Sequence, residues 1–546
     1  MAVRTGLKRL ASIILALLTT APVASVAPAA VVVRVTMPAV ATGPLSGRLL
    51  LFAQPLALAK AAAGSGEIRA VDARLDNPRA TAIAAMEIHD LSPGAVVEMD
   101  ADTLAYSKAF SALAPGPYAV QAVLDVSHHY AYAGRGPGDW LSPVTGVELP
   151  AGGAVTLVAA IPPAPDPWAA VASMGAEVRA RLARARADTQ LVDFVSPVLS
   201  RFWGRPAHMR GWVLTPPGYG ASPMRRYPTV YFTHGFGGDL NNLVQFAIYI
   251  DQAMADGSAP PMIWVLLDES SSTGTHEFAD SVNNGPWGQA LTSELIPDLE
   301  RRWRMDARVK GRFLNGHSSG GWASLWLQTR YPKVFGGTWS TSPDPSDFHD
   351  FTGTDLYAPG SNVYRRADGS LTPLVRDHGK VLATMEDFAR IEAVEGDYGG
   401  QMTSFDWVFS PRGPDGRPEP MFDRATGAVD PAVVAYWRDN YDIAFRLARD
   451  WPRLKPDLDG KIHVIVGTAD SFYLDGAAHR LKGVLDTVGA KSDFRFLPER
   501  THFDLNRVGD DNFALIKQIA WEMYAVARPG SRRSDGSQEP DVTGRH

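Results

Sequence analysis

The segment 316–321, with the sequence GHSSGG, constrains the fold of this chain more than any other part of it. A predicted strand, 312–314, comes before it, and a predicted helix, 322–329, follows it. In a strand, sharp turn and helix of this kind, the glycines let the turn hold Ser318 in a strained conformation, with its hydroxyl exposed above a sheet. The segment therefore predicts an α/β domain that presents a serine for chemistry, and not a glycine-rich loop that arose by chance.

Strands and helices alternate along the second half of the chain. The runs 227–232 and 262–267 have the composition of buried strands, 290–303 has the pattern of a helix, and 311–315 is a third predicted strand. This alternation predicts a mostly parallel sheet that is covered by helices on both faces. We assign this α/β domain to residues 196–528.

The first part of the chain has a different pattern. Residues 30–162 contain short β-rich runs between Pro-Gly and Gly-Gly turns, and no strong helical period. Such runs predict a β-sandwich domain, in which the hydroxyl of Tyr118 can close a corner. A Pro-rich linker with a helix is expected in 163–195, and the polar residues 529–546 are typical of a disordered tail.

The N-terminus has the pattern of a cleavable secretory signal. Three basic residues precede the apolar run 10–18, and small residues follow up to Ala30. Because this run is much shorter than the roughly 20 residues that span a bilayer, 1–29 is predicted to be a signal peptide and not a membrane anchor. The mature protein is then expected to be secreted or periplasmic.

Composition excludes several kinds of chemistry. The 546 residues include no Cys, so the chain has no disulfide, no Cys nucleophile and no Cys-ligated metal. A net charge of −6 argues against nucleic acid as a partner. Neither a phosphate-binding G-x-x-x-x-G-K nor a zinc-binding H-E-x-x-H sequence occurs, so no cofactor and no metal are expected.

A serine hydroxyl is a weak nucleophile until a base accepts its proton and N–H groups stabilise the oxyanion that forms. The loop 233–239, with the sequence THGFGGD, follows an earlier buried strand and can point a backbone N–H at that charge. We expect the N–H groups of Phe236 and Ser319 to form this oxyanion hole. For His234 we expect a hydrogen bond that shapes the loop, and not proton transfer.

The acid of such a site follows the serine in the chain, and the base follows the acid. Asp470 begins the loop after the predicted strand 461–467, at the edge where open α/β sheets assemble their sites. Asp475 is the alternative, but a cap of the next helix is the simpler interpretation of that residue.

The base is expected to be His502, which lies in a loop after the predicted strand 494–497. His463 and His479 fall in a predicted strand and a predicted helix, where a structural role is expected. In this arrangement His502 would deprotonate Ser318, Asp470 would orient the imidazole, and water would release the acyl group.

Five segments resemble, in this order, the esterase family of α/β-hydrolases that includes S-formylglutathione hydrolase (esterase D), the enterochelin esterases and the feruloyl esterases. They are YPTVYFTHGFGGD, ELIPDLERRW, GHSSGGWASLWL, GTADSFY and the loop of His502. The resemblance covers about residues 202–528, outside much of a middle insertion. It implies an α/β-hydrolase fold and a carboxylic ester hydrolase, with Ser318, Asp470 and His502 in the triad positions. The mycolyl transferases are more distant relatives.

About a hundred residues, 342–451, separate the strand after the serine from the strand before Asp470. We interpret this insertion as a cap over the site because of its position and its aromatic residues, Tyr357, Tyr364, Phe405, Trp407 and Tyr436. The sequence does not choose among small-molecule and polysaccharide-linked esters as substrates. Two alternatives stay open: an acyltransferase of the mycolyl-transferase-like type, and a non-catalytic protein that binds carbohydrate or a partner.

Overall fold

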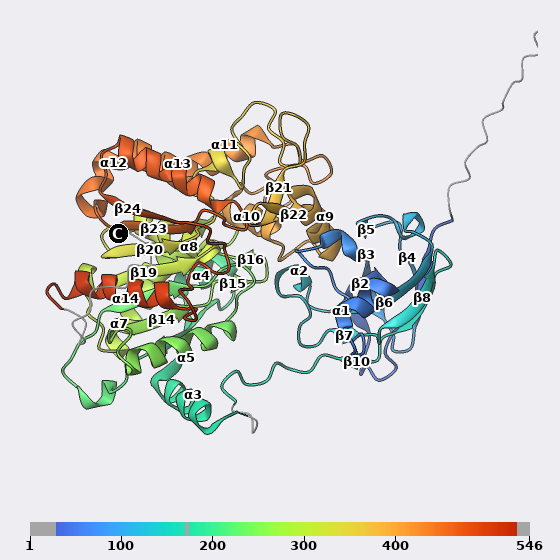
Figure 1. Cartoon of the computed structure of the whole chain (residues 1–546), viewed down its shortest axis with the longest axis horizontal. Helices are drawn as coiled ribbons and strands as arrows, with labels where there is room; N and C mark the ends of the chain where they lie inside the picture. The colour runs from blue at the N-terminus through green and yellow to red at the C-terminus, as the bar shows by residue number, and fades with distance from the viewer. Residues whose placement is uncertain (1–28, 170–173, 532–546) are drawn as a thin grey trace, which may run out of the picture.

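The structure is a computed structural model that describes residues 29–169 and 174–531 (Figure 1). The predicted signal peptide, 1–29, lies outside the described residues except for Ala29, and so do most of the predicted tail and part of the linker, 170–173. Within the described ranges, no helix is long and apolar enough to cross a membrane. A β-rich N-terminal part, drawn in blue to teal in Figure 1, lies beside a larger α/β part, drawn in teal to red.

Eight strands form the sheet of the α/β part, in the order β11-β12-β14-β13-β19-β20-β23-β24. All neighbours from β14 to β24 are parallel, whereas β12 pairs antiparallel with both β11 and β14. Strands β13, β14, β19, β23 and β24 coincide with the runs for which the sequence predicts strands, and these predictions are therefore confirmed. The bounds are β11 Thr189–Val195, β12 His208–Leu214, β13 Thr229–Thr233, β14 Ile263–Leu267, β19 Arg312–His317, β20 Gly337–Thr341, β23 Ile462–Gly467 and β24 Ser492–Leu497.

Helices cover both faces of this sheet, as predicted. Alternate residues of β13 point to opposite faces, so that Val230 and Phe232 pack in one core and Tyr231 packs in another. The first core also holds residues of α5 and α14, and the second holds residues of α7 and α8. The helices are α3 Ala176–Asp188, α4 Pro197–Trp203, α5 Asn242–Ala255, α6 Trp287–Ala290, α7 Ile296–Arg302, α8 Ser319–Arg330, α12 Ile443–Leu458, α13 Leu474–Thr487 and α14 Ala514–Ala527, with a π-helical turn, Leu291–Leu295, between α6 and α7.

The N-terminal part contains two sheets, one with the order β4-β1-β9 and one with the order β10-β7-β6-β2-β3-β5, on which β8 pairs with β6. Apolar residues of both sheets share one core. The hydroxyl of Tyr118 donates to the carbonyl oxygen of Ala114 at 3.0 Å, which confirms the predicted corner. The longest strands are β2 Leu45–Pro55, β3 Ala82–Leu91 and β6 Gly116–Asp125; the others are β1 Val32–Thr36, β4 Val96–Asp100, β5 Ala105–Tyr106, β7 Trp140–Leu141, β8 Thr145–Leu149, β9 Gly153–Thr156 and β10 Ala159–Ala160.

Two short helices in this part were not expected. Helix α1, Leu56–Ala63, follows β2 without a break, and its Ala-rich sequence favours a helix although only Ala59 is buried. Helix α2, Tyr130–Ala133, is a single turn. In Figure 1 α2 lies on the side of the N-terminal part that faces the α/β part.

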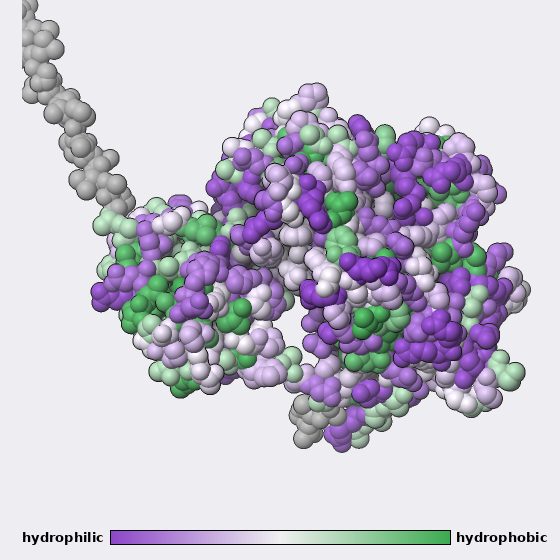
Figure 2. All heavy atoms as spheres, turned by 180° about the vertical axis from the view of Figure 1, so that it is seen from behind, coloured by the Kyte–Doolittle hydropathy of each residue, from purple (hydrophilic) through white to green (hydrophobic). Residues whose placement is uncertain are grey.

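The insertion between β20 and α12 packs against the N-terminal part as well as the α/β part. It contains the hairpin β21 Pro373–Asp377 and β22 Lys380–Thr384, then α9 Met385–Glu395, α10 Gln401–Phe409 and α11 Pro431–Asn440. Helix α9 contacts the N-terminal part: Arg48 donates to the carbonyl oxygen of Val394 at 2.9 Å, and Arg79 pairs with Asp387 at 2.8 Å. Figure 2 shows the two parts in contact above an open gap.

Candidate active site

Ser318 lies at the turn between β19 and α8, where the sequence predicts it. Its backbone has φ 61° and ψ −125°, a strained conformation for a residue with a side chain. A Cβ added at Gly320 would lie 2.3 Å from the carbonyl oxygen of His234, and one added at Gly316 would lie 2.1 Å from that of Gly320. Close packing therefore requires these glycines, and Ser318 is left partly exposed at the tip of the turn.

Replacing Gly320 by Ala should lower the free energy of unfolding by about 1–3 kcal/mol, because the added methyl group overlaps backbone atoms of Thr233 and His234. Gly483→Ala is the matched control. Gly483 lies in α13, and a Cβ there meets no atom within 4 Å, so Ala should stabilise this helix by about 0.5–1 kcal/mol. Urea unfolding measures both free energies. If the two variants unfolded alike, the close packing of the turn would be contradicted.

His502 and Asp470 are hydrogen-bonded to each other. Nδ1 of His502 lies 3.0 Å from Oδ2 of Asp470, and the N–H of Phe472 donates to Oδ1 of the same carboxylate at 2.9 Å. Burial alone would raise the pKa of Asp470, but His502 and the hydrogen bonds hold that pKa below its usual value. Asp470 therefore stays charged. Because Nδ1 of His502 is hydrogen-bonded to Asp470, only Nε2 of the ring can bind a group in the cavity. His502 lines this cavity.

A second histidine, His317, lies against His502, with their ring centroids 4.4 Å apart. Burial, together with the neighbouring His502, lowers the pKa of His317 to about 3. Nδ1 of His317 lies 3.2 Å from the hydroxyl of Thr341. His317 is therefore neutral near pH 7, and His502 is the ring that is hydrogen-bonded to a carboxylate.

The loop after β13 lies directly beside Ser318. A Cβ added at Gly235 would lie 3.0 Å from the Cβ of Ser318. Nδ1 of His234 lies 2.8 Å from the carbonyl oxygen of Gly235, so His234 shapes this loop as expected. Among the described residues, the backbone N–H groups of Phe236 and Ser319 have no acceptor. Both N–H groups are thus available to a ligand at Ser318.

Asp344 belongs to this site although no motif indicated it. It follows β20, whose carboxyl end lies next to that of β19. Its carboxylate accepts a hydrogen bond from the hydroxyl of Ser319 at 2.6 Å and lies 3.5 Å from the hydroxyl of Ser318. Burial raises the pKa of Asp344 to about 6. Its place after the strand next to β19 was the one available signal, because the ends of neighbouring parallel strands meet at one edge.

Asp344→Asn should stabilise the protein at high pH and not at low pH. The pKa of Asp344 is about 6 in the folded protein against 3.8 for an ordinary Asp. Below about pH 4 the carboxyl is protonated in both states, and its cost to folding grows as the pH rises from about 4 to 6. The gain in free energy of unfolding should therefore reach about 2–3 kcal/mol at pH 8. Thermal unfolding of the variant and the wild type at about pH 4 and at about pH 8 measures this gain. Asp439→Asn, at an exposed position, is the control. A gain of equal size at low pH would show that the charge is not its cause.

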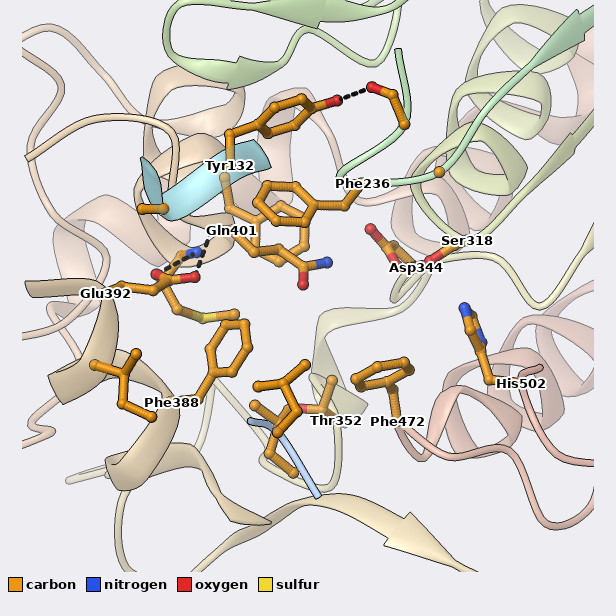
Figure 3. Close-up of a pocket in the computed structure, with 18 of the residues that line it drawn as sticks. Tyr132, Phe236, Ser318, Asp344, Thr352, Phe388, Glu392, Gln401, Phe472 and His502 are labelled. Atoms are coloured by element: carbon orange, nitrogen blue, oxygen red, sulfur yellow. Dashed lines mark hydrogen bonds between the residues drawn. The ribbon is translucent and has the colours of Figure 1, made fainter. Parts of the chain in front are cut away.

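A cavity of about 660 Å³ opens beside Ser318 and His502 (Figure 3). Residues from the N-terminal part, from the α/β part and from the insertion form its walls. Most of the lining side chains are apolar, and they include Phe236, Leu374, Phe388, Ile391, Met402, Phe405, Phe472 and Leu474. Glu392 lies on the side of the cavity opposite His502 in Figure 3. The cavity can thus hold a bulky apolar group next to Ser318.

The insertion contributes a wall of this cavity, but mostly through residues other than the expected ones. Phe405 lines the cavity, whereas Tyr364 is buried and packs against Phe422. Trp407 lies at a separate pocket beside Tyr398. Aromatic composition therefore did not show which side chains of the insertion face the serine.

Residues 205–473 match the model of a protein family described as "Putative esterase". The resemblance to the esterase family that the motifs predict is therefore confirmed for this part of the chain. The matched residues include Ser318 and Asp470, and His502 lies beyond them. The N-terminal two-sheet part lies outside the match.

Two curated proteins are similar to part of this chain. An endo-1,4-beta-xylanase/feruloyl esterase of Xylanibacter ruminicola is 26% identical over 130 residues, which are 23% of this chain and 18% of that protein. An esterase of Mycobacterium tuberculosis is 29% identical over 148 residues, which are 26% of this chain and 31% of that protein. The chain thus spans less than a third of the length of these relatives.

Among solved structures, an S-formylglutathione hydrolase from Agrobacterium tumefaciens matches 62% of this chain and 94% of its own, with 14% identity and a TM-score of 0.37. A ferulic acid esterase from Anaeromyces mucronatus matches 62% of this chain and 89% of its own, with 14% identity and a TM-score of 0.34.

Proposed function

We propose that this protein hydrolyses carboxylic esters and that Ser318, His502 and Asp470 act as its catalytic triad. One observation carries the proposal. Ser318, at the tip of a strained turn, shares a cavity with His502, and the Nδ1 atom of this histidine is hydrogen-bonded to the buried Asp470. The esterase family of residues 205–473 supports the same reaction.

In the proposed reaction each group has a separate role. Nε2 of His502 accepts the proton of Ser318 as its Oγ attacks the acyl carbonyl, while Asp470 stabilises the imidazolium. The N–H groups of Phe236 and Ser319 hold the oxyanion of the tetrahedral intermediate. His502 then returns the proton to the leaving alcohol. Water attacks the acyl-enzyme with the same base and releases the acid.

The cavity favours substrates with a bulky apolar acyl group, because most of its lining side chains are apolar. Two of the similar proteins are named feruloyl or ferulic acid esterases. We therefore propose aromatic acyl esters, free or linked to a polysaccharide, as the substrate class. No observation specifically favours an acyltransferase or a protein that only binds.

The remaining proposals concern the N-terminal residues. The two sheets with a common core support the interpretation of residues 30–162 as a β-sandwich domain. The basic residues and the short apolar run of 1–29 support export of the protein to the periplasm or the exterior.

Hydrolysis of methyl ferulate and of p-nitrophenyl acetate, combined with fluorophosphonate labelling and peptide mapping, tests the proposed function. We expect release of ferulate and a label on Ser318. Assays with added alcohols separate the alternatives, because an acyltransferase would form a new ester in preference to the free acid. A folded protein that neither hydrolyses esters nor takes up the label would refute the proposal.

A further inference from the structure

The outer side of the loop 234–238 meets a residue of the N-terminal part, Tyr132 of α2. The hydroxyl of Tyr132 donates a hydrogen bond to the carbonyl oxygen of Gly238 at 2.6 Å. Its ring packs edge-on against the ring of Phe236, with the ring centroids 5.0 Å apart. Figure 3 shows both contacts at the edge of the cavity. Tyr132 therefore touches the loop on both sides of Gly237.

We propose that Tyr132 is a positioning residue that holds the N–H of Phe236 in place for the oxyanion, so that the N-terminal part takes part in the reaction. This inference rests on the proposed function, because an oxyanion forms only if Ser318 attacks an acyl carbonyl.

The loop needs support from outside because its own backbone is soft. Three of its five residues are glycines, and Gly237 has φ 77°. Glycine has more accessible backbone conformations than any other residue. The bonds inside the loop, from His234 and from the N–H of Gly238, both reach the carbonyl oxygen of Gly235. The bond from Gly238 closes a turn that runs from Gly235 to Gly238 around Phe236, and the bond from Tyr132 ties the end of this turn to the N-terminal part.

Tyr132 is itself held firmly. The N–H of Tyr130, at the start of α2, donates to the carboxylate of Asp125 at 2.9 Å, and the ring of Tyr130 packs against Phe52 of β2. On the other side lies the insertion, where a Cβ added at Gly399 would lie 3.1 Å from the Cβ of Tyr132. The hydroxyl therefore reaches Gly238 from a fixed position.

The protonation state of Tyr132 suits this role. Burial, with the carboxylates of Glu269 and Asp268 nearby, raises the pKa of Tyr132 above its usual value. The phenol therefore keeps its proton and remains a hydrogen-bond donor at every pH at which the reaction would be measured.

The two contacts matter because an oxyanion hole works only when its donors are in place before the charge develops. Loss of one donor typically costs about 10² to 10³ in kcat, and a shift of about 1 Å can cost about 10². Without Tyr132 the loop can move, and the N–H of Phe236 would then lie away from the position of the oxyanion. Ser318, His502 and Asp470 would keep their positions.

The test compares Tyr132→Phe and Tyr132→Ala with Tyr118→Phe in the full-length protein. Tyr118→Phe is the matched control. The hydroxyl of Tyr118, like that of Tyr132, donates to a carbonyl oxygen, but its partner, Ala114, lies in the corner of the N-terminal part and not in the loop. We expect Tyr132→Phe to lower kcat about tenfold and Tyr132→Ala about a hundredfold. KM should stay within about twofold, because the contact acts on the transition state and not on substrate binding.

Fluorophosphonate labelling adds a readout that does not depend on release of the acyl group. The rate of labelling of Ser318 should fall by factors similar to those for kcat, because the phosphoryl oxygen uses the same N–H groups. The melting temperatures of Tyr132→Phe and Tyr118→Phe should be similar, which separates a positioning role from a loss of stability.

Three results would overturn the inference. Tyr132→Phe could have the kcat and labelling rate of Tyr118→Phe while the wild-type protein is active. Tyr132→Phe could raise KM alone, which would make Tyr132 a substrate contact. A wild-type protein that neither hydrolyses esters nor labels would overturn the proposed function, and this inference with it.

Discussion

Replacing Ser318 by Ala should lower kcat for ester hydrolysis by about 10⁵ to 10⁶, because no other group can form the acyl-enzyme. The effect should be confined to the reaction. The hydroxyl of Ser318 has one weak contact, at 3.5 Å from the carboxylate of Asp344, and the turn is held by backbone packing around Gly316 and Gly320. The variant should therefore fold with a melting temperature close to that of the wild type. Initial rates with methyl ferulate measure the loss.

Ser293→Ala is the control for this prediction. Ser293 is an exposed serine whose hydroxyl donates to the carbonyl oxygen of Gln289, so its loss should leave kcat unchanged. If Ser318→Ala kept more than about a hundredth of the wild-type kcat, Ser318 would not be the nucleophile.

Asp470→Asn should lower kcat by about 10⁴. The carboxylate of Asp470 accepts a hydrogen bond from the Nδ1–H group of His502, and this leaves Nε2 without a proton and free to act as the base. An amide at this place presents its N–H groups to Nδ1 and favours the other tautomer, in which Nε2 carries the proton. The shape of the side chain is nearly unchanged, so KM should change much less than kcat. Steady-state kinetics of the variant separate the two constants.

Asp475→Asn is the matched control, because Asp475 is the alternative acid five positions further along the chain. It lies in the first turn of α13 and pairs with Arg376 at 2.8 Å, and not with His502. We expect it to lower kcat by less than about tenfold, through the shift of an ion pair. A larger loss for Asp475→Asn than for Asp470→Asn would exchange the roles of the two residues.

The order of elements and the main residues of the site could be read from the sequence for a simple reason. Strands of a parallel sheet are buried on both faces, so β13 and β14 have mostly apolar sequences, and β19 has the apolar pair Phe313 and Leu314 before the glycine-rich turn. Each candidate residue then follows the end of such a strand. Because all these ends lie at one edge of the sheet, residues far apart in the chain, such as Asp470 and His502, could be expected to meet.

Other features depend on contacts that leave no local pattern. Asp344 is an ordinary Asp in the sequence, and only burial beside Ser319 makes its pKa unusual. Helix α1 was not expected because its Ala-rich stretch is only eight residues long and buries one residue, Ala59, so that it has no single apolar face. In the insertion, composition identified five aromatic residues, but packing decided that Phe405 faces the cavity and that Tyr364 faces the core.

The sequence by itself determined the strained turn at Ser318, the parallel sheet and the order of the serine, the acid and the base. Glycine spacing and apolar runs are local properties of the chain, and they favour the same turn and the same strands whatever the distant segments do. Only the tertiary structure decided that Tyr132 of the N-terminal part reaches Gly238, and that three parts of the chain enclose one cavity. These contacts join residues about a hundred or more positions apart, and their energies depend on the shapes of both partners, which neither segment encodes alone.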